Sequence, residues 1–227
     1  RVSMAIRRPP TTFSDSITGA DLASDIAIST TGNIATTGSG TLTVAGNTTL
    51  SGTNNLGSNP TVTLGSNATF PAHHILQIVQ TVKTDTISES GSGSINFQDI
   101  SGMSCSITPQ TGNKVLVFFT ANLGGRVGYM ASLRLVRGST AINVGETQGS
   151  RTRAAYTWRG ESYNVWNANS MFLDASPGGD GSTAITYKLQ WTGESGNTMY
   201  LNRNYNHSNN YYHGVSTSSI TLMEVKG

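Results

Sequence analysis

Residues 114–123 read KVLVFFTANL, and this stretch decides the class of fold. Apolar side chains follow one another from Val115 to Phe119, with the turn signal Gly112-Asn113 before them and Gly124-Gly125 after the stretch. A short, continuous apolar run between turn signals is typical of a β-strand that is buried on both faces. The sequence therefore predicts a strand here whose two faces are both covered.

Eight further runs of strand length accompany it along the chain, and most of them alternate between apolar and polar residues. In LRLVRG, for example, Leu133 and Leu135 share one face and Arg134 takes the other. Strands of period two at this spacing, with no helical period anywhere, predict an all-β fold, which we expect to be a jelly-roll-like β-sandwich head over residues 72–227. The eight runs are residues 75–84, 94–109, 129–138, 140–146, 170–175, 183–193, 197–204 and 218–225.

The sequence before the head has a different character. Residues 33–70 read NIATTGSGTLTVAGNTTLSGTNNLGSNPTVTLGSNATF, almost without charge, and one apolar residue recurs before each small turn. Repeats this sparse need neighbours stacked against them, so residues 33–71 are predicted to form a β stalk in which three identical chains intertwine. A disordered Gly/Ser/Thr linker is the alternative. The residues predicted to face the threefold axis are Val44, Leu50, Leu56 and Leu64.

Residues 1–32 are predicted to be an extended arm that docks on another protein. Pro9 and Pro10 oppose a helix and favour extended backbone. The following residues carry more apolar side chains than a free tail requires, although a frayed terminus is the alternative. The docking residues are predicted to be Ile6, Phe13, Ile17, Leu22 and Ile26.

The composition is polar but weakly charged. Charged residues make up 11% of the 227, against about 25% in an average protein, and the net charge is only +2. That charge is too small to indicate nucleic-acid binding, and no apolar run is long enough to insert into a membrane. Cys105 is the single cysteine, so it forms no disulfide within the chain, and we expect it to be a small buried hydrophobic residue.

No sequence motif indicates catalysis or a cofactor. The motifs GxSxG, HExxH and the phosphate-binding loop are absent from the sequence. Glycan cleavage needs two carboxylates, and only Glu146 and Glu161, on either side of an aromatic segment, merit a test. His73 or His74 is a weak candidate for a metal site on a threefold axis, although adjacent residues on a strand point to opposite faces. We expect no enzyme activity, no cofactor and no metal.

Two segments predicted to be long loops stand out by their aromatic and amide content. Residues 147–169 and 202–214 combine Tyr and Trp with Asn, Arg and His. Tyr and Trp offer apolar faces with a polar edge, a mixture that suits sugars and protein epitopes alike. Burial in the core, Trp166 above all, or at an interface between chains is the alternative. The receptor-binding candidates are Tyr156, Trp158, Arg159, Tyr163, Tyr205, His207, Tyr211, Tyr212 and His213.

Several segments of the head together resemble a known family. They include HHILQIVQTVKTDT (73–86), FQDISGMSCSITPQTGNKVLV (97–117), LRLVRGSTAI (133–142) and SSITLMEV (218–225). With the Thr/Gly/Asn-rich residues before them, they resemble fibre proteins of marine bacteriophages, such as those that infect cyanobacteria and other abundant ocean bacteria. The two aromatic segments depart from that pattern.

The resemblance implies a homotrimeric virion fibre, attached to the particle through its amino-terminal arm and other virion proteins. The head would then present a surface to a host glycan or an outer-membrane protein. A purely structural role on the tail or capsid is the alternative, and a polysaccharide-degrading head is a second one.

Overall fold

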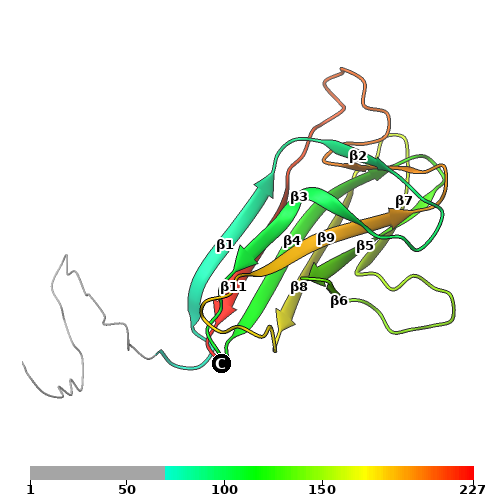
Figure 1. Cartoon of the computed structure of the whole chain (residues 1–227). Helices are drawn as coiled ribbons and strands as arrows, with labels where there is room; N and C mark the ends of the chain where they lie inside the picture. The colour runs from blue at the N-terminus through cyan, green and yellow to red at the C-terminus, as the bar shows by residue number, and fades with distance from the viewer. Residues whose placement is uncertain (1–69) are drawn as a thin grey trace, which may run out of the picture. The chain divides into compact units, whose positions relative to one another are not determined.

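The computed structural model describes residues 70–227, which form a sandwich of two antiparallel β-sheets (Figure 1). No helix occurs in this part of the chain, so it holds no helical segment that would cross a membrane. The prediction of an all-β sandwich is confirmed, while the jelly-roll connectivity stays a prediction. Sheet A contains β1 (Ile75–Lys83), β2 (Ile87–Ser90), β4 (Lys114–Gly125), β8 (Trp166–Asp174), β10 (Thr198–Leu201) and β11 (Ser218–Val225). Sheet B contains β3 (Gln98–Ile107), β5 (Met130–Arg137), β6 (Thr140–Ile142), β7 (Tyr156–Arg159) and β9 (Ile185–Gly193).

Each of the nine predicted runs overlaps a strand, although β8 begins at Trp166, four residues before its predicted run, and two short strands were not predicted. β2 pairs with β10, and β7 lies inside the first aromatic segment, where it pairs with β5. The predicted arm and stalk, with Val44, Leu50, Leu56 and Leu64, lie outside the described residues.

The core lies between the sheets and is built from alternate residues of the strands. Val117 and Phe119 of β4 and Leu133 of β5 are fully buried. Cys105 is also buried, as predicted. Trp191 of β9 is among the largest fully buried side chains. Burial of side chains of this size contributes most of the favourable free energy of folding.

One ion pair, whose carboxylate is buried, joins the two sheets. The Asp174 carboxylate in β8 accepts hydrogen bonds of 2.8 Å from Arg137 Nη1 of β5 and from the Tyr187 hydroxyl of β9. Burial, the main cause, and the hydrogen bond to Asp174, the second, raise the pKa of Tyr187 far above its usual value. The hydroxyl therefore stays protonated and donates to Asp174. This ion pair connects the edge strand β8 of sheet A to β5 of sheet B and so fixes the position of β8 over sheet B.

The strand that decides the fold differs from its prediction in one respect. Val115, Val117 and Phe119 point into the sandwich, but Leu116 is only half-buried and Phe118 is 41% exposed. In a single chain, the prediction that both faces of this strand are covered is therefore wrong. The outer face of sheet A carries apolar side chains that nothing in the described residues covers.

The chain enters and leaves the head at the same end, which we call the base. The backbone amide of His73 donates to Lys226 O at 2.8 Å, and Lys226 N donates to His74 O at the same distance. Beside them the buried Glu224 carboxylate accepts hydrogen bonds from Asn113 Nδ2 and from the Gln110 backbone amide. Burial alone would raise the pKa of Glu224, but the bonds from Asn113, Gln110 and Gln77 outweigh it and lower the pKa below its usual value.

Glu224→Gln is expected to lower the free energy of unfolding at pH 7 by about 1–2 kcal/mol, because charged acceptors form stronger hydrogen bonds. A lowered pKa stabilises the fold above the pKa of the unfolded state, and this contribution is lost as the pH falls through the pKa of the folded state. The difference between wild type and variant should therefore shrink below about pH 4. Urea unfolding at several pH values measures it, with exposed Glu161→Gln as the matched control. A difference that stays constant with pH would contradict the prediction.

Candidate functional site

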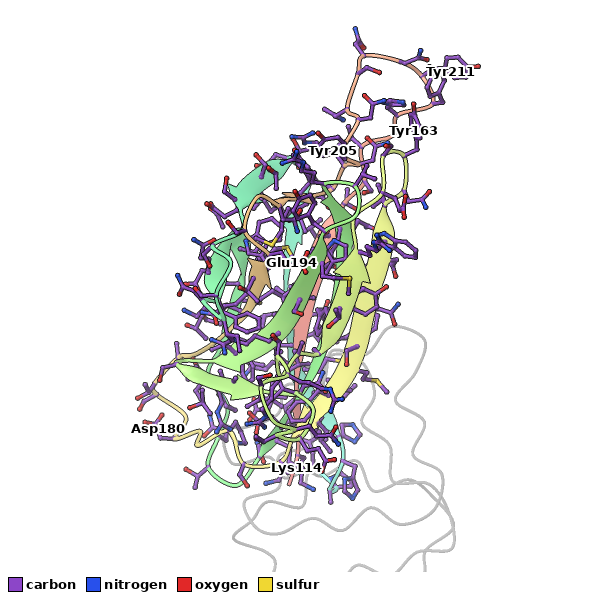
Figure 2. All side chains as sticks on the ribbon, turned by 90° about the vertical axis from the view of Figure 1, so that its right-hand side faces the viewer. Lys114, Tyr163, Asp180, Glu194, Tyr205 and Tyr211 are labelled. Carbon is purple, nitrogen blue, oxygen red and sulfur yellow. The ribbon has the colours of Figure 1, made fainter. Side chains whose placement is uncertain are left out.

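The aromatic residues gather at the end of the head opposite the base, which we call the tip. β1 and β11 pair from Ile75↔Val225 at the base to Lys83↔Ser218 at the other end, a span of about 27 Å. Two loops lie beyond that end, residues 160–165 between β7 and β8 and residues 202–217 between β10 and β11. Figure 2 shows Tyr163, Tyr205 and Tyr211 there, far from Lys114 at the base.

Asn202 holds the root of the longer tip loop. It is fully buried and has a φ of 63°, a left-handed conformation that Asn tolerates better than most residues. Its side-chain amide donates to Lys83 O and Asp85 O at 2.9 and 2.8 Å. Its carbonyl oxygen accepts from the Ser218 hydroxyl at 2.6 Å. The loop therefore departs from a fixed point that ties β1, β10 and β11 together.

Four aromatic rings form a continuous series across the tip. The Tyr163 ring lies 5.7 Å from the His213 ring, centroid to centroid, and the His213 ring lies 4.8 Å from Tyr212. The Tyr211 ring follows 5.3 Å from Tyr212, and all three pairs meet edge to face. Edge-to-face pairs at such distances are favourable. We call Tyr163, Tyr211, Tyr212 and His213 the tip cluster.

His213 is the buried centre of the tip cluster. Its Nδ1 accepts a hydrogen bond from the Ser208 backbone amide at 3.2 Å, which places the proton of the neutral ring on Nε2. The other three members are exposed: Tyr211 by 98%, Tyr163 by 66% and Tyr212 by 62%. The two loops are also joined through Asn204 Nδ2, which donates to Tyr163 O, and through the Asn206 amide, which donates to Ser162 O. A braced set of exposed phenol rings can stack on an apolar partner face and exchange hydrogen bonds at its edge.

Two of the remaining candidates also lie in the tip loops. Tyr205 is 38% exposed and packs edge to face on Tyr200 at 6.0 Å, while the Arg203 guanidinium lies 3.9 Å from the Tyr200 ring centroid. His207 is exposed in the same loop as Tyr211.

The three candidates from β7 lie apart from the tip cluster. Tyr156 is half-buried against the core, and exposed Arg159 donates from Nε to Gly128 O at 3.3 Å. The structure corrects the prediction for Trp158, which is only 3% exposed and donates from Nε1 to Gly124 O. Trp158 belongs to the core because β7 pairs with β5 and turns alternate residues inward. Trp166, for which burial in the core was the alternative, is 37% exposed.

A groove on the outer face of sheet B is a second concave surface. Its volume is about 440 Å³, and Ile95 and Arg151 line both this groove and a neighbouring hollow of about 250 Å³. Five of the groove's twelve lining residues carry a hydroxyl group, among them Ser94, Ser132 and Thr157. Arg134 lines the smaller hollow and stacks on Phe97 at 4.0 Å. The segment of Arg151 stands out in the sequence, but the groove does not, because its walls come from segments far apart along the chain.

The residues considered for catalysis and metal binding are not brought together. Glu146 and Glu161 are both exposed, and no hydrogen bond joins them within residues 70–227. His73 adopts a φ of 69° in a turn before β1, so the argument from adjacent strand residues does not apply to it. The His74 ring stacks on Phe70 at 5.4 Å. The described residues contain no cluster of three metal-ligating side chains.

Comparison with known proteins identifies no family for this chain. No family model matches the chain, and no curated protein is significantly similar to it in sequence. Among solved structures, it is similar to a chain of the infectious bursal disease virus Gx strain, with 11% identity and a TM-score of 0.32. The match covers 74% of this chain and 46% of the viral chain, so it spans less than half of that structure.

Proposed function

We propose that this chain is a structural protein of a bacteriophage particle, a homotrimeric fibre whose head meets the host surface through the tip cluster. Residues 1–32 would attach it to other virion proteins, and residues 33–71 would form the stalk. The proposal is supported by the repeats before the head, by the resemblance of the head segments to phage fibres, and by the position of the tip cluster.

The position of the tip cluster carries the receptor part of the proposal. Three exposed tyrosines lie at the end of the head farthest from Phe70, where the preceding residues join it. A fibre anchored by its amino terminus would present this end first to a cell. Exposed tyrosine rings framed by Asn side chains suit a glycan first and an outer-membrane protein second. Several heads on one particle would convert weak single contacts into firm attachment.

The test is competition for host adsorption by purified full-length protein. Wild-type protein should block adsorption of the phage that carries it. The triple variant Tyr163→Ala/Tyr211→Ala/Tyr212→Ala should need at least about tenfold more protein, because truncated aromatic anchors at an interface each cost more than about 1 kcal/mol. Thr111→Ala, an exposed change near the base, is the control and should block like wild type.

Three outcomes would change the proposal. Equal blocking by the triple variant and the wild type would remove the tip cluster from the receptor site. If even wild-type protein failed to block, and particles without the fibre adsorbed normally, a purely structural role would replace attachment. The proposal contains no catalytic step, so release of reducing sugar from host polysaccharide, lost in Glu146→Gln, would replace it with a polysaccharide-degrading head.

A further inference from the structure

The two outer faces of the sandwich differ in chemistry. On sheet B, polar side chains of neighbouring strands pair across the outer face. Lys188 Nζ donates to Asp99 at 2.8 Å, and Arg134 Nε donates to Gln190 at 2.8 Å. Such a ladder is what an antiparallel sheet shows where it faces water. The outer face of sheet B therefore shows what a water-exposed sheet face looks like in this protein, and the outer face of sheet A can be compared with it.

The outer face of sheet A follows the order β1-β11-β4-β8 and is mostly apolar. The register aligns its side chains in rows across four strands. One row is Ile78, Met223, Leu116 and Leu173, and the next is Gln80, Thr221, Phe118 and Met171. We call the following residues the apolar face: Ile75, Ile78, Val82, Leu116, Phe118, Met171, Leu173, Met223 and Val225.

The apolar face exposes more apolar side-chain area than a surface in contact with water usually does. Met171 is 69% exposed, Ile78 58% and Val82 52%. Four strands spaced about 4.8 Å apart, with eight residues of about 3.4 Å each, cover roughly 500 Å² in all, and the apolar side chains share this area with polar ones such as Gln80, Thr221 and Asn169. Monomeric proteins seldom expose contiguous apolar patches beyond a few hundred Å². This area is of the order of the roughly 800 Å² that each partner contributes to a stable interface.

The composition of this face indicates its partner. Lys114 is the one charged side chain among the outward-facing residues of these four strands. The amides of Asn122, Asn167 and Asn169 are paired with one another. A face with a single charge at its end resembles a protein core cut in half, which is typical of permanent interfaces between identical chains rather than of transient contacts.

The chain before the head points to the same partner. The repeats of residues 33–64 need identical neighbours to bury Val44, Leu50, Leu56 and Leu64. They are joined through residues 65–74 to β1, which is the edge strand of the apolar face. The neighbours that complete the stalk would therefore hold two further heads beside this face.

We infer that the apolar face is where three copies of this head pack around a threefold axis. The inference rests on the homotrimer of the proposed function but not on host attachment. Cyclic symmetry joins two different surfaces, so the β1 edge of one head meets the β8 edge of the next, while β4 and β11 line the axis. With the axis parallel to the strands, residues of one row stay at one height. Ile78 of one chain then lies beside Leu173 of its neighbour, and three Phe118 side chains meet near the axis.

The experiment uses the full chain with cysteines at both edges of one row. Ile78→Cys/Leu173→Cys, treated with a short bismaleimide crosslinker, should give covalent trimers on denaturing gels, and each single variant should give none. Ser106→Cys/Thr157→Cys, two exposed positions on the outer face of sheet B, is the matched control and should not link chains. Adding Phe118→Asp should reduce the covalent trimer at least about tenfold, because three like charges would meet without water. Circular dichroism checks that this variant remains folded.

Sedimentation of the untreated protein separates the remaining outcomes. The protein could have a trimeric mass, form no crosslink between Ile78→Cys and Leu173→Cys, and keep that mass in the Phe118→Asp variant. This outcome would overturn the apolar face as the interface and leave the homotrimer standing. A monomeric mass would overturn both. A monomer whose Met171 is protected from oxidation until residues 1–69 are removed would show that the chain's own amino-terminal part covers this face.

Discussion

Trp158→Ala is expected to lower the free energy of unfolding of the head by about 3–5 kcal/mol. The indole is 3% exposed in the core, and its removal leaves a cavity that β5 and β7 cannot close without breaking their pairing. The Gly124 carbonyl loses a hydrogen bond as well. Urea unfolding followed by circular dichroism measures the change.

The control for this prediction is Tyr163→Ala, which truncates an aromatic residue five positions farther along the chain. Its side chain is 66% exposed, so its effect on stability should stay within about 0.5 kcal/mol. The two variants thus separate a core residue from a surface residue within one aromatic segment. A stable Trp158→Ala protein that no longer blocks host adsorption would restore Trp158 to the receptor site.

Trp158 also shows why it is difficult to predict from the sequence which residues of this segment form a strand and which form a loop. β7 is four residues long, and its alternation of Tyr156 and Trp158 inward with Thr157 and Arg159 outward covers only two periods. Longer runs such as β9 repeat the alternation often enough to predict a strand. A short strand is fixed by its partner, here β5, and the partner lies about 25 residues away along the chain.

The tip cluster could be predicted in composition but not in arrangement. Both aromatic segments were recognised, and the structure brings Tyr163 of one beside His213 of the other. The exposure of each ring depends on where the loops leave the sheets, which Asn202 fixes through bonds to Lys83, Asp85 and Ser218. Such long-range bonds leave no periodic signal in a sequence.

The run KVLVFF was predicted correctly as a strand but wrongly as covered within one chain. A continuous apolar run indicates that both faces of a strand are apolar. It does not indicate whether the same chain or another chain covers them. Phe118 pairs across the face with Met171 of β8, itself 69% exposed. The prediction that both faces of this strand are covered agrees with the structure if a second copy of the head packs on its outer face.

Arg137→Met is expected to lower the free energy of unfolding by about 2–4 kcal/mol at pH 7, because it leaves the buried Asp174 carboxylate without its cation. The effect should fall short of that for a fully buried pair, since the Arg137 side chain is 27% exposed. Methionine keeps the apolar stem, so the change isolates the charge. Lys188→Met breaks the exposed pair with Asp99 and should cost no more than about 1 kcal/mol.

The second variant in this test is Asp174→Asn in the Arg137→Met background. If the cost arises from an unpaired buried charge, removing that charge should recover part of the lost stability, because a neutral amide is cheaper to bury than a carboxylate. The Tyr187 hydroxyl keeps an oxygen acceptor in the double variant. Equal losses for Arg137→Met and Lys188→Met, or a further loss in the double variant, would mean that packing rather than charge makes this contact between the sheets stable. Comparison of the Arg137→Met variant with the double variant thus decides what holds β8, the edge strand that carries Met171 and Leu173, over sheet B.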